Sequence, residues 1–142
     1  MKYLVFILML AFLSCGDDEI DLSGKWDLAY LDIASCMNIN DNVFINLMMR
    51  DCARINGMDV CYEAEVDFTS SEITTIITTK AGGASRTDTR NFTYTVDGED
   101  MTICEGSNDC WIGSWILEGD TFSFAGVGVQ DGCSILFETV RR

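Results

Sequence analysis

Seven cysteines and no histidine define the chemistry open to this chain of 142 residues. Imidazole is the usual general base of hydrolytic triads and a frequent ligand of catalytic zinc, so both kinds of site are excluded. A cysteine nucleophile would lack an activating base for the same reason. No two cysteines have the CxxC spacing of a metal cluster. We therefore predict a protein that is not an enzyme and that holds no metal and no other cofactor.

Six cysteines remain when Cys15 is set aside, and an even number predicts disulfides in a chain that reaches an oxidising compartment. Cys104 and Cys110 flank a polar, turn-like stretch between two predicted strands. Cys52 and Cys61 flank Asn56-Gly57, and Cys36 with Cys133 is then left by elimination. Six cysteines permit fifteen pairings, and the spacing favours this one without excluding the others.

The N-terminus reads Met1-Lys2 followed by an apolar run of eleven residues, Tyr3–Leu13. Eleven helical residues span about 16 Å, too short for a bilayer core of about 30 Å, so the run is typical of a secretory signal. Phe12-Leu13-Ser14-Cys15 resembles a bacterial lipobox, which implies cleavage before Cys15 and lipidation of its thiol. The alternative is an ordinary signal peptide with Cys15 in a disulfide. We expect a signal peptide at 1–14, an acidic tether at 15–22 and a single domain at 23–142.

Acidic residues dominate the charge, with 23 Asp and Glu against 9 Lys and Arg and a net charge of −14. Such a chain repels nucleic-acid backbones and anionic headgroups, so we expect no nucleic-acid partner and contact with a membrane only through the lipid anchor. Gly16-Asp17-Asp18-Glu19 resembles the surface-export signal of Bacteroidetes lipoproteins, and its alternative reading is a solvated tether. The resemblance implies an outer-membrane lipoprotein whose domain lies at the cell surface.

Short alternating runs, separated by Gly, Asn and Asp, predict strands along the rest of the chain. In Cys61–Phe68, for example, apolar residues at even positions alternate with acidic ones. The eight predicted strands are Lys25–Asp32, Cys61–Phe68, Glu72–Lys80, Phe92–Val96, Met101–Cys104, Cys110–Glu118, Thr121–Ala125 and Cys133–Val140. One short helix, Asp41–Arg54, is predicted between the first two, and 80–90 is predicted as a loop. Because eight antiparallel strands in sequence order leave two open edges unless they close, we predict an all-β, up-and-down barrel.

Gly24-Lys25-Trp26, at the start of the first strand, resembles the Gly-x-Trp signature that opens lipocalin barrels. In lipocalins an arginine near the end of the last strand packs across that tryptophan, and Arg141 is similarly placed. With the lipobox and the acidic tether, the chain resembles lipocalin-like lipoproteins of the Bacteroidetes type. The predicted helix, with Phe44, Leu47 and Met48, is similar to the helical lid of fatty-acid-binding proteins. The resemblance implies a binding protein for a small apolar ligand.

Aromatic residues dominate the predicted interior and are the candidate ligand contacts, with tyrosines as polar handles. The candidates are Trp26, Tyr30, Tyr62, Phe92, Tyr94, Trp111, Trp115 and Phe122. Ala64 and Gly113 are small, inward-facing positions where a cavity is expected to open. In the alternative interpretation the rings fill the barrel completely. The protein would then be a solid-core interaction module, an inhibitor or an envelope-assembly subunit, with an unspecified protein partner.

Overall fold

The computed structural model describes residues 20–39, 42–48 and 51–142. The described residues form ten strands: β1 (Gly24–Ala34), β2 (Val43–Asn46), β3 (Cys52–Ile55), β4 (Met58–Phe68), β5 (Glu72–Ala81), β6 (Ala84–Asp97), β7 (Asp100–Glu105), β8 (Asp109–Glu118), β9 (Thr121–Gly128) and β10 (Ser134–Arg141). No helix in this part of the chain is long and apolar enough to cross a bilayer. The predicted signal peptide and Cys15 lie outside the described residues.

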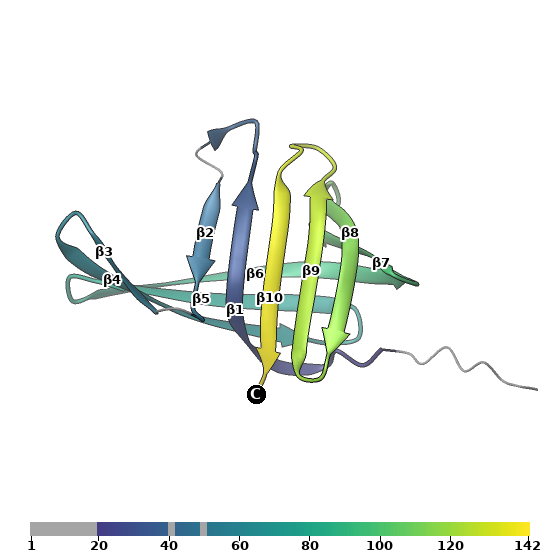
Figure 1. Cartoon of the computed structure of the whole chain (residues 1–142), viewed down its shortest axis with the longest axis horizontal. Coiled ribbons are helices and arrows are strands. Elements are labelled where there is room, and N and C mark those ends of the chain that lie inside the picture. Colours follow the sequence, from purple (N-terminus) through teal and green to yellow (C-terminus); the bar gives the residue numbers. More distant parts are fainter. Residues whose placement is uncertain (1–19, 40–41, 49–50) are drawn as a thin grey trace, which may run out of the picture.

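Eight of these strands form a closed antiparallel barrel (Figure 1). From β4 to β10 each strand pairs with the next in sequence, and β10 pairs with β1. The ring closes where Gly24–Asp27 of β1 pairs with Glu65–Phe68 of β4, a ladder that we call the seam. The predicted all-β, eight-stranded up-and-down barrel is confirmed, and every predicted strand overlaps an observed one.

The prediction of a helix between the first two barrel strands is wrong. Its described residues form two short strands instead, β2 paired with β1 and β3 paired with β4, while Asp41, the predicted N-cap, lies outside the described residues. Consecutive β-branched and aromatic residues, Val43 to Ile45, favour extended backbone over helix. Asn56-Gly57, interpreted as a helix stop, is the two-residue turn of the β3–β4 hairpin, with φ of 51° and 81°.

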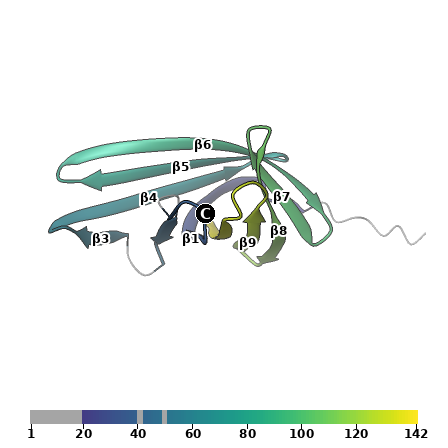
Figure 2. The same cartoon turned by 90° about the horizontal axis from the view of Figure 1, so that it is seen from above.

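The segment 80–90, predicted as a loop, is also extended. Gly82 and Gly83 alone form the turn, with φ of 56° and 81°, and the flanking residues continue β5 and β6. Together with β3 and the first half of β4, this long hairpin projects beyond the barrel on the left of Figures 1 and 2. We call this projection the arm. The sequence of 80–90 is rich in Thr, Ser and charged residues, and therefore lacks the apolar alternation that marks a strand in a sequence.

Three disulfides connect Cys36 with Cys133, Cys52 with Cys61 and Cys104 with Cys110. These are the three pairs that the spacing favoured. Two of them cross hairpins between directly opposite residues, Cys52 with Cys61 and Cys104 with Cys110. The third links Cys36, just after β1, to Cys133, just before β10, across 97 residues of sequence and so fastens the first barrel strand to the last.

Candidate ligand-binding pocket

The barrel interior next to the seam is filled by aromatic rings. Trp26 and Phe122 are completely buried, and their ring centroids lie 6.4 Å apart in an edge-to-face arrangement. Phe68 lies against both, 5.8 Å from Trp26 and 5.3 Å from Phe122. Edge-to-face contacts of this kind fill space efficiently, so this end of the barrel has no room for a ligand. Trp26 and Phe122, two of the predicted ligand contacts, are therefore core residues.

Trp26 also has the surroundings that the lipocalin resemblance implied. The guanidinium of Arg141 lies 4.6 Å from the centre of its ring, from the directly opposite position on β10. The indole Nε1 donates a hydrogen bond of 2.9 Å to the carbonyl of Leu22, which brings the buried Leu22 side chain into the core. The segment before β1 thus covers this end of the barrel.

Four further predicted contacts belong to the barrel wall, and one of them, Tyr94, lies beside the seam with its ring centre 6.0 Å from that of Phe68. Tyr94 is buried and its hydroxyl donates to the carbonyl of Thr69 at 2.7 Å. Burial raises the pKa of Tyr94, with a smaller contribution from the charge of Asp21. Trp111 lies 6.3 Å from Phe92, ring centre to ring centre, and the half-buried Trp115 donates from Nε1 to the carbonyl of Gly98 at 3.1 Å. Phe92, Tyr94 and Trp115 thus have partners within the protein, whereas the buried indole N–H of Trp111 contacts Phe92 through its ring only and has no hydrogen-bond acceptor among the described residues.

Tyr30 does not face the interior. The β1–β10 register shifts between Leu28 and Tyr30, and this bulge reverses the alternation predicted for β1. Leu31 packs against the core instead, while Tyr30 makes an edge contact with the exposed Phe44 ring at 5.7 Å. Its pKa is raised by partial burial first and by the neighbouring carboxylate of Asp32 second.

Gly113, one of the two positions where we expected a cavity, is closed by backbone. It lies opposite Gly126 on β9, and a Cβ at Gly113 would overlap the carbonyl oxygen of Ala125. Ala64, the other position, is buried in the core cluster. The predicted central cavity is therefore absent at both of these positions.

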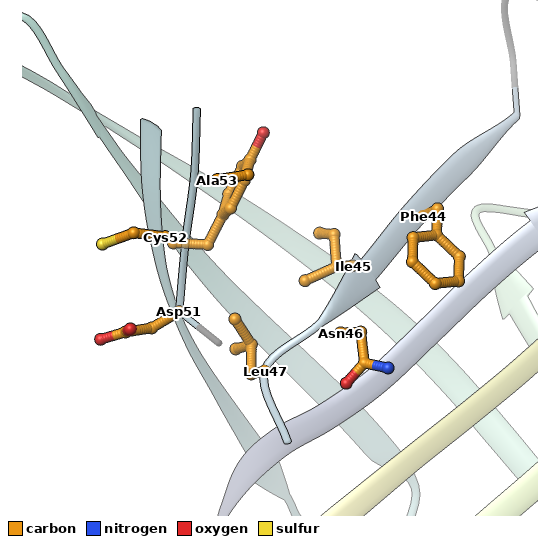
Figure 3. A pocket seen from close by; sticks show the side chains of 8 residues that line it. Phe44, Ile45, Asn46, Leu47, Asp51, Cys52 and Ala53 are labelled. Atoms are coloured by element: carbon orange, nitrogen blue, oxygen red, sulfur yellow. The ribbon is translucent and has the colours of Figure 1, made fainter. Parts of the chain in front are cut away.

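A pocket of about 500 Å³ lies elsewhere, between β2 and the β3–β4 hairpin. It is lined by Phe44, Ile45, Asn46, Leu47, Asp51, Cys52, Ala53 and Tyr62. Ile45 of β2 and Leu47, just after β2, project toward β3, whereas Asp51 and Cys52 point away from them (Figure 3). Apolar side chains thus face the space, and Asp51, the one charged residue among the described lining residues, lies on its margin. Tyr62 is the only predicted ligand contact among them.

The pocket exists because β1 and β4 separate beyond the seam. The two strands are paired only as far as Asp27 and Glu65. After the bulge β1 pairs with β2 from Tyr30 onward, while the first residues of β4 pair with β3. The walls of the pocket are the facing sides of these two added strands. Sequence reasoning missed their residues because all of them except Tyr62 fall in the segment predicted as a helix.

The described lining of the pocket is mainly apolar. It offers aliphatic and aromatic surface, the Tyr62 hydroxyl, the Asn46 amide and a single carboxylate from Asp51. Acid–base chemistry of the glycosidase kind requires two carboxyl groups facing one another, and Asp51 carries the one carboxyl group among the lining residues that the structure describes. A second hollow, of about 450 Å³, lies on the arm between Ile77, Thr79, Ala81, Ala84, Ser85, Arg86 and Asp88. It is more polar and contains charges of both signs.

Proteins similar to this chain are found among solved structures. No protein-family model matches the chain, and no curated protein sequence does. Among solved structures, human cRBP IV is similar over 87% of this chain and 99% of its own, with 15% sequence identity and a TM-score of 0.35. The assignment to an up-and-down barrel rests on the strand order of this chain itself and on the pairing of β1 with β4 that closes the ring.

Proposed function

We propose that this protein is a non-enzymatic binding protein of the cell envelope, which is anchored by a lipid at Cys15 and holds one small apolar ligand between β2 and the β3–β4 hairpin. The observation that carries the proposal is the pocket. Its volume of about 500 Å³ falls within the range of about 300–1,000 Å³ that is typical of small-molecule sites. Its lining is mainly apolar, with a few polar groups at the margin, as such sites require to orient a ligand.

Filling the pocket tests this proposal directly. Ala53 lines it and is half-buried, so Ala53→Phe places a ring in the space without opening the core. We expect the wild-type protein to bind retinol or oleate with a stoichiometry of about one, as measured by calorimetric titration, and we expect Ala53→Phe to weaken binding at least about tenfold. A tenfold loss corresponds to about 1.4 kcal/mol, a modest loss for the displacement of a buried ligand surface.

Ala125→Phe is the matched control, because Ala125 is an exposed residue on β9 and lies outside the pocket. This variant carries the same added ring and should bind as the wild type does. Absence of saturable binding of either probe would refute the pocket as a ligand site. Equal weakening by both variants would refute its location.

The lipid anchor rests on the sequence alone, on Phe12-Leu13-Ser14-Cys15 and the apolar run before it. A lipid chain contributes about 0.8 kcal/mol per buried methylene, so two or three chains hold a domain stably at a membrane. The Cys15→Ala variant is expected to move from the membrane fraction to the soluble fraction. The control variant Ser14→Ala, which keeps Cys15, should stay membrane-bound. Retention of Cys15→Ala in membranes would contradict the anchor.

The filled aromatic interior supports the alternative of a solid-core interaction module. Trp26, Phe68 and Phe122 leave no central cavity next to the seam, as the alternative of a filled barrel predicts. The ligand titration separates the two candidates, because a solid-core module has no saturable small-molecule site.

A further inference from the structure

The first half of β6 is a sheet edge. β7 covers only Thr93–Asp97, so Ala84–Asn91 pairs with β5 on one side and, among the described residues, with no strand on the other. In Figure 2 this part of β6 forms the outer margin of the arm. Eight consecutive residues of open edge are a site at which another strand can add.

The orientation of the backbone on this edge is fixed by the alternation of an antiparallel sheet. The amide of Tyr94 donates to the carbonyl of Ser71, just before β5, at 2.8 Å. Even-numbered residues of β6 therefore bond toward β5, and odd-numbered ones bond away from it. Ser85, Thr87 and Thr89 thus present their N–H and C=O groups outward, ready to pair.

The side chains at this edge carry opposite charges two residues apart. Arg86 and Asp88 are exposed, lie on the same face of β6, and have no ion-pair partner among the described residues. With a net charge of −14, two copies of this chain repel one another at long range. Two copies can therefore associate only where opposite charges on their surfaces face one another. This edge carries charges of both signs, so two copies of the edge can pair their charges.

We propose that this edge binds a second copy of the chain, with the two β6 strands antiparallel about a twofold axis through Thr87. In that register Ser85 of each copy lies opposite Thr89 of the other. The outward N–H and C=O groups of the two strands then face one another and can form hydrogen bonds. Arg86 of each copy lies opposite Asp88 of the other, which gives two symmetric ion pairs. Cross-strand pairs of opposite charge, and of Thr with Ser or Thr, stabilise antiparallel sheets.

Neighbouring registers are disfavoured. An axis through Asp88 would place Asp88 against its own copy and Arg86 against Arg90, and like charges directly opposite are destabilising. An axis through Thr89 would bring Ser85 of the second copy against Thr93, whose outer side is already occupied by Cys104 of β7. The register through Thr87 alone combines matched charges with an unobstructed edge.

Charge reversal at these two positions provides the test. In the full chain, purified in mild detergent, we expect sedimentation equilibrium to show a dimer. Arg86→Asp and Asp88→Arg should each raise the dissociation constant at least about tenfold, because each variant creates two like-charge pairs. Mixing the two single variants, each with a different affinity tag, should restore association. In the mixed dimer the two introduced side chains face one another, as do the unchanged Arg86 of one copy and the unchanged Asp88 of the other.

Lys80→Asp is the control, since it makes the same kind of charge change on β5 of the same hairpin, away from the edge; it should leave the dimer unaffected. A wild-type chain that stays monomeric up to about 1 mM would overturn the proposal. So would a dimer that both single variants leave intact, or a mixture of variants that associates no better than each alone. Ligand binding at the pocket is independent of this result.

Discussion

Trp26 links the sequence motif to the packing of the closed barrel end. The Gly-x-Trp signature placed it at the start of the first strand, and in the structure its ring contacts Phe68 and Phe122 beneath the guanidinium of Arg141. The exposed fraction of its side chain is 0%. A residue with this environment contributes to stability through burial and ring packing rather than through ligand contact.

Trp26→Ala is therefore expected to lower the free energy of unfolding by roughly 3–5 kcal/mol, the usual cost of a large-to-small change in a core. Urea denaturation followed by circular dichroism measures the change. Trp26→Phe keeps an aromatic ring and should lose clearly less. A near-neutral result for Trp26→Ala would contradict the position of this ring in the barrel.

At the scale of strands, β8 and β9 approach closely where Gly113 faces Gly126. A side chain at Gly113 would overlap the backbone of Ala125, which has no flexible end that could move aside. We expect Gly113→Ala to destabilise the protein by about 1–3 kcal/mol, as overpacking does. Thermal unfolding would measure this loss. Ser114→Ala, on the exposed side of the same strand, should be nearly neutral, and equal effects would argue against close approach of these strands.

The barrel strands could be predicted because their alternation is long enough to recognise. Cys61–Phe68 gives four full periods of apolar and polar residues. β2 and β3 have only four residues each, too few to show a period, and the spacing of Val43 and Leu47 also fits one face of a helix. The start of β6 has no apolar face, because it lies at the margin of the arm. The extended conformation of these segments is determined by their pairing with neighbouring strands and not by a pattern in their own sequence.

The same limit explains what the sequence revealed of the candidate site. Tyr62 was found because it lies on a strongly alternating strand, whereas Ile45, Leu47 and Ala53 were hidden in the segment predicted as a helix. The outward position of Tyr30 depends on a bulge, and a bulge changes the face of every residue after it. The Cys52–Cys61 pairing was correct although the structure around Cys52 was not, because Asn56-Gly57 brings the chain back in either case.

At the scale of the whole molecule, the seam that closes the barrel depends on charge. Asp27 and Glu65 lie directly opposite one another on β1 and β4, a repulsive pairing. The guanidinium of Arg142 donates hydrogen bonds of 2.6 Å to both carboxylates, and the Lys25 ammonium lies 2.6 Å from Glu65. Hydrogen bonds from Lys25 first and Arg142 second hold the pKa of Glu65 below its usual value.

This lowered pKa predicts acid weakening of the seam. A carboxylate whose pKa is depressed by folding contributes stability above its unfolded pKa, about 4.5 for Glu65, and the contribution is lost as the pH falls through the folded value. Arg142→Ala should therefore lower stability at pH 7, and the difference from the wild type should shrink toward pH 3. Urea denaturation at pH 7, 5 and 3 measures both effects.

Arg90→Ala, which removes an exposed ion pair with Glu105 outside the seam, is the control and should have little effect at any pH. A loss in Arg142→Ala that stays constant between pH 7 and pH 3 would show that the arginine acts through packing and not through its charge.

The first and last barrel strands lie side by side, and this order has a consequence for biogenesis. β1 pairs over most of its length with β10, and Cys36 forms its disulfide with Cys133. During synthesis β1 therefore has no partner on its β10 side until nearly all of the chain has emerged, and until then Trp26 lacks its contacts with Phe122 and Arg141. Contacts so distant in sequence form slowly. A chain interrupted before Cys133 would keep a free thiol at Cys36 and an open edge on β1 where β10 should pair. Open strand edges and exposed apolar surface favour association between unfinished chains.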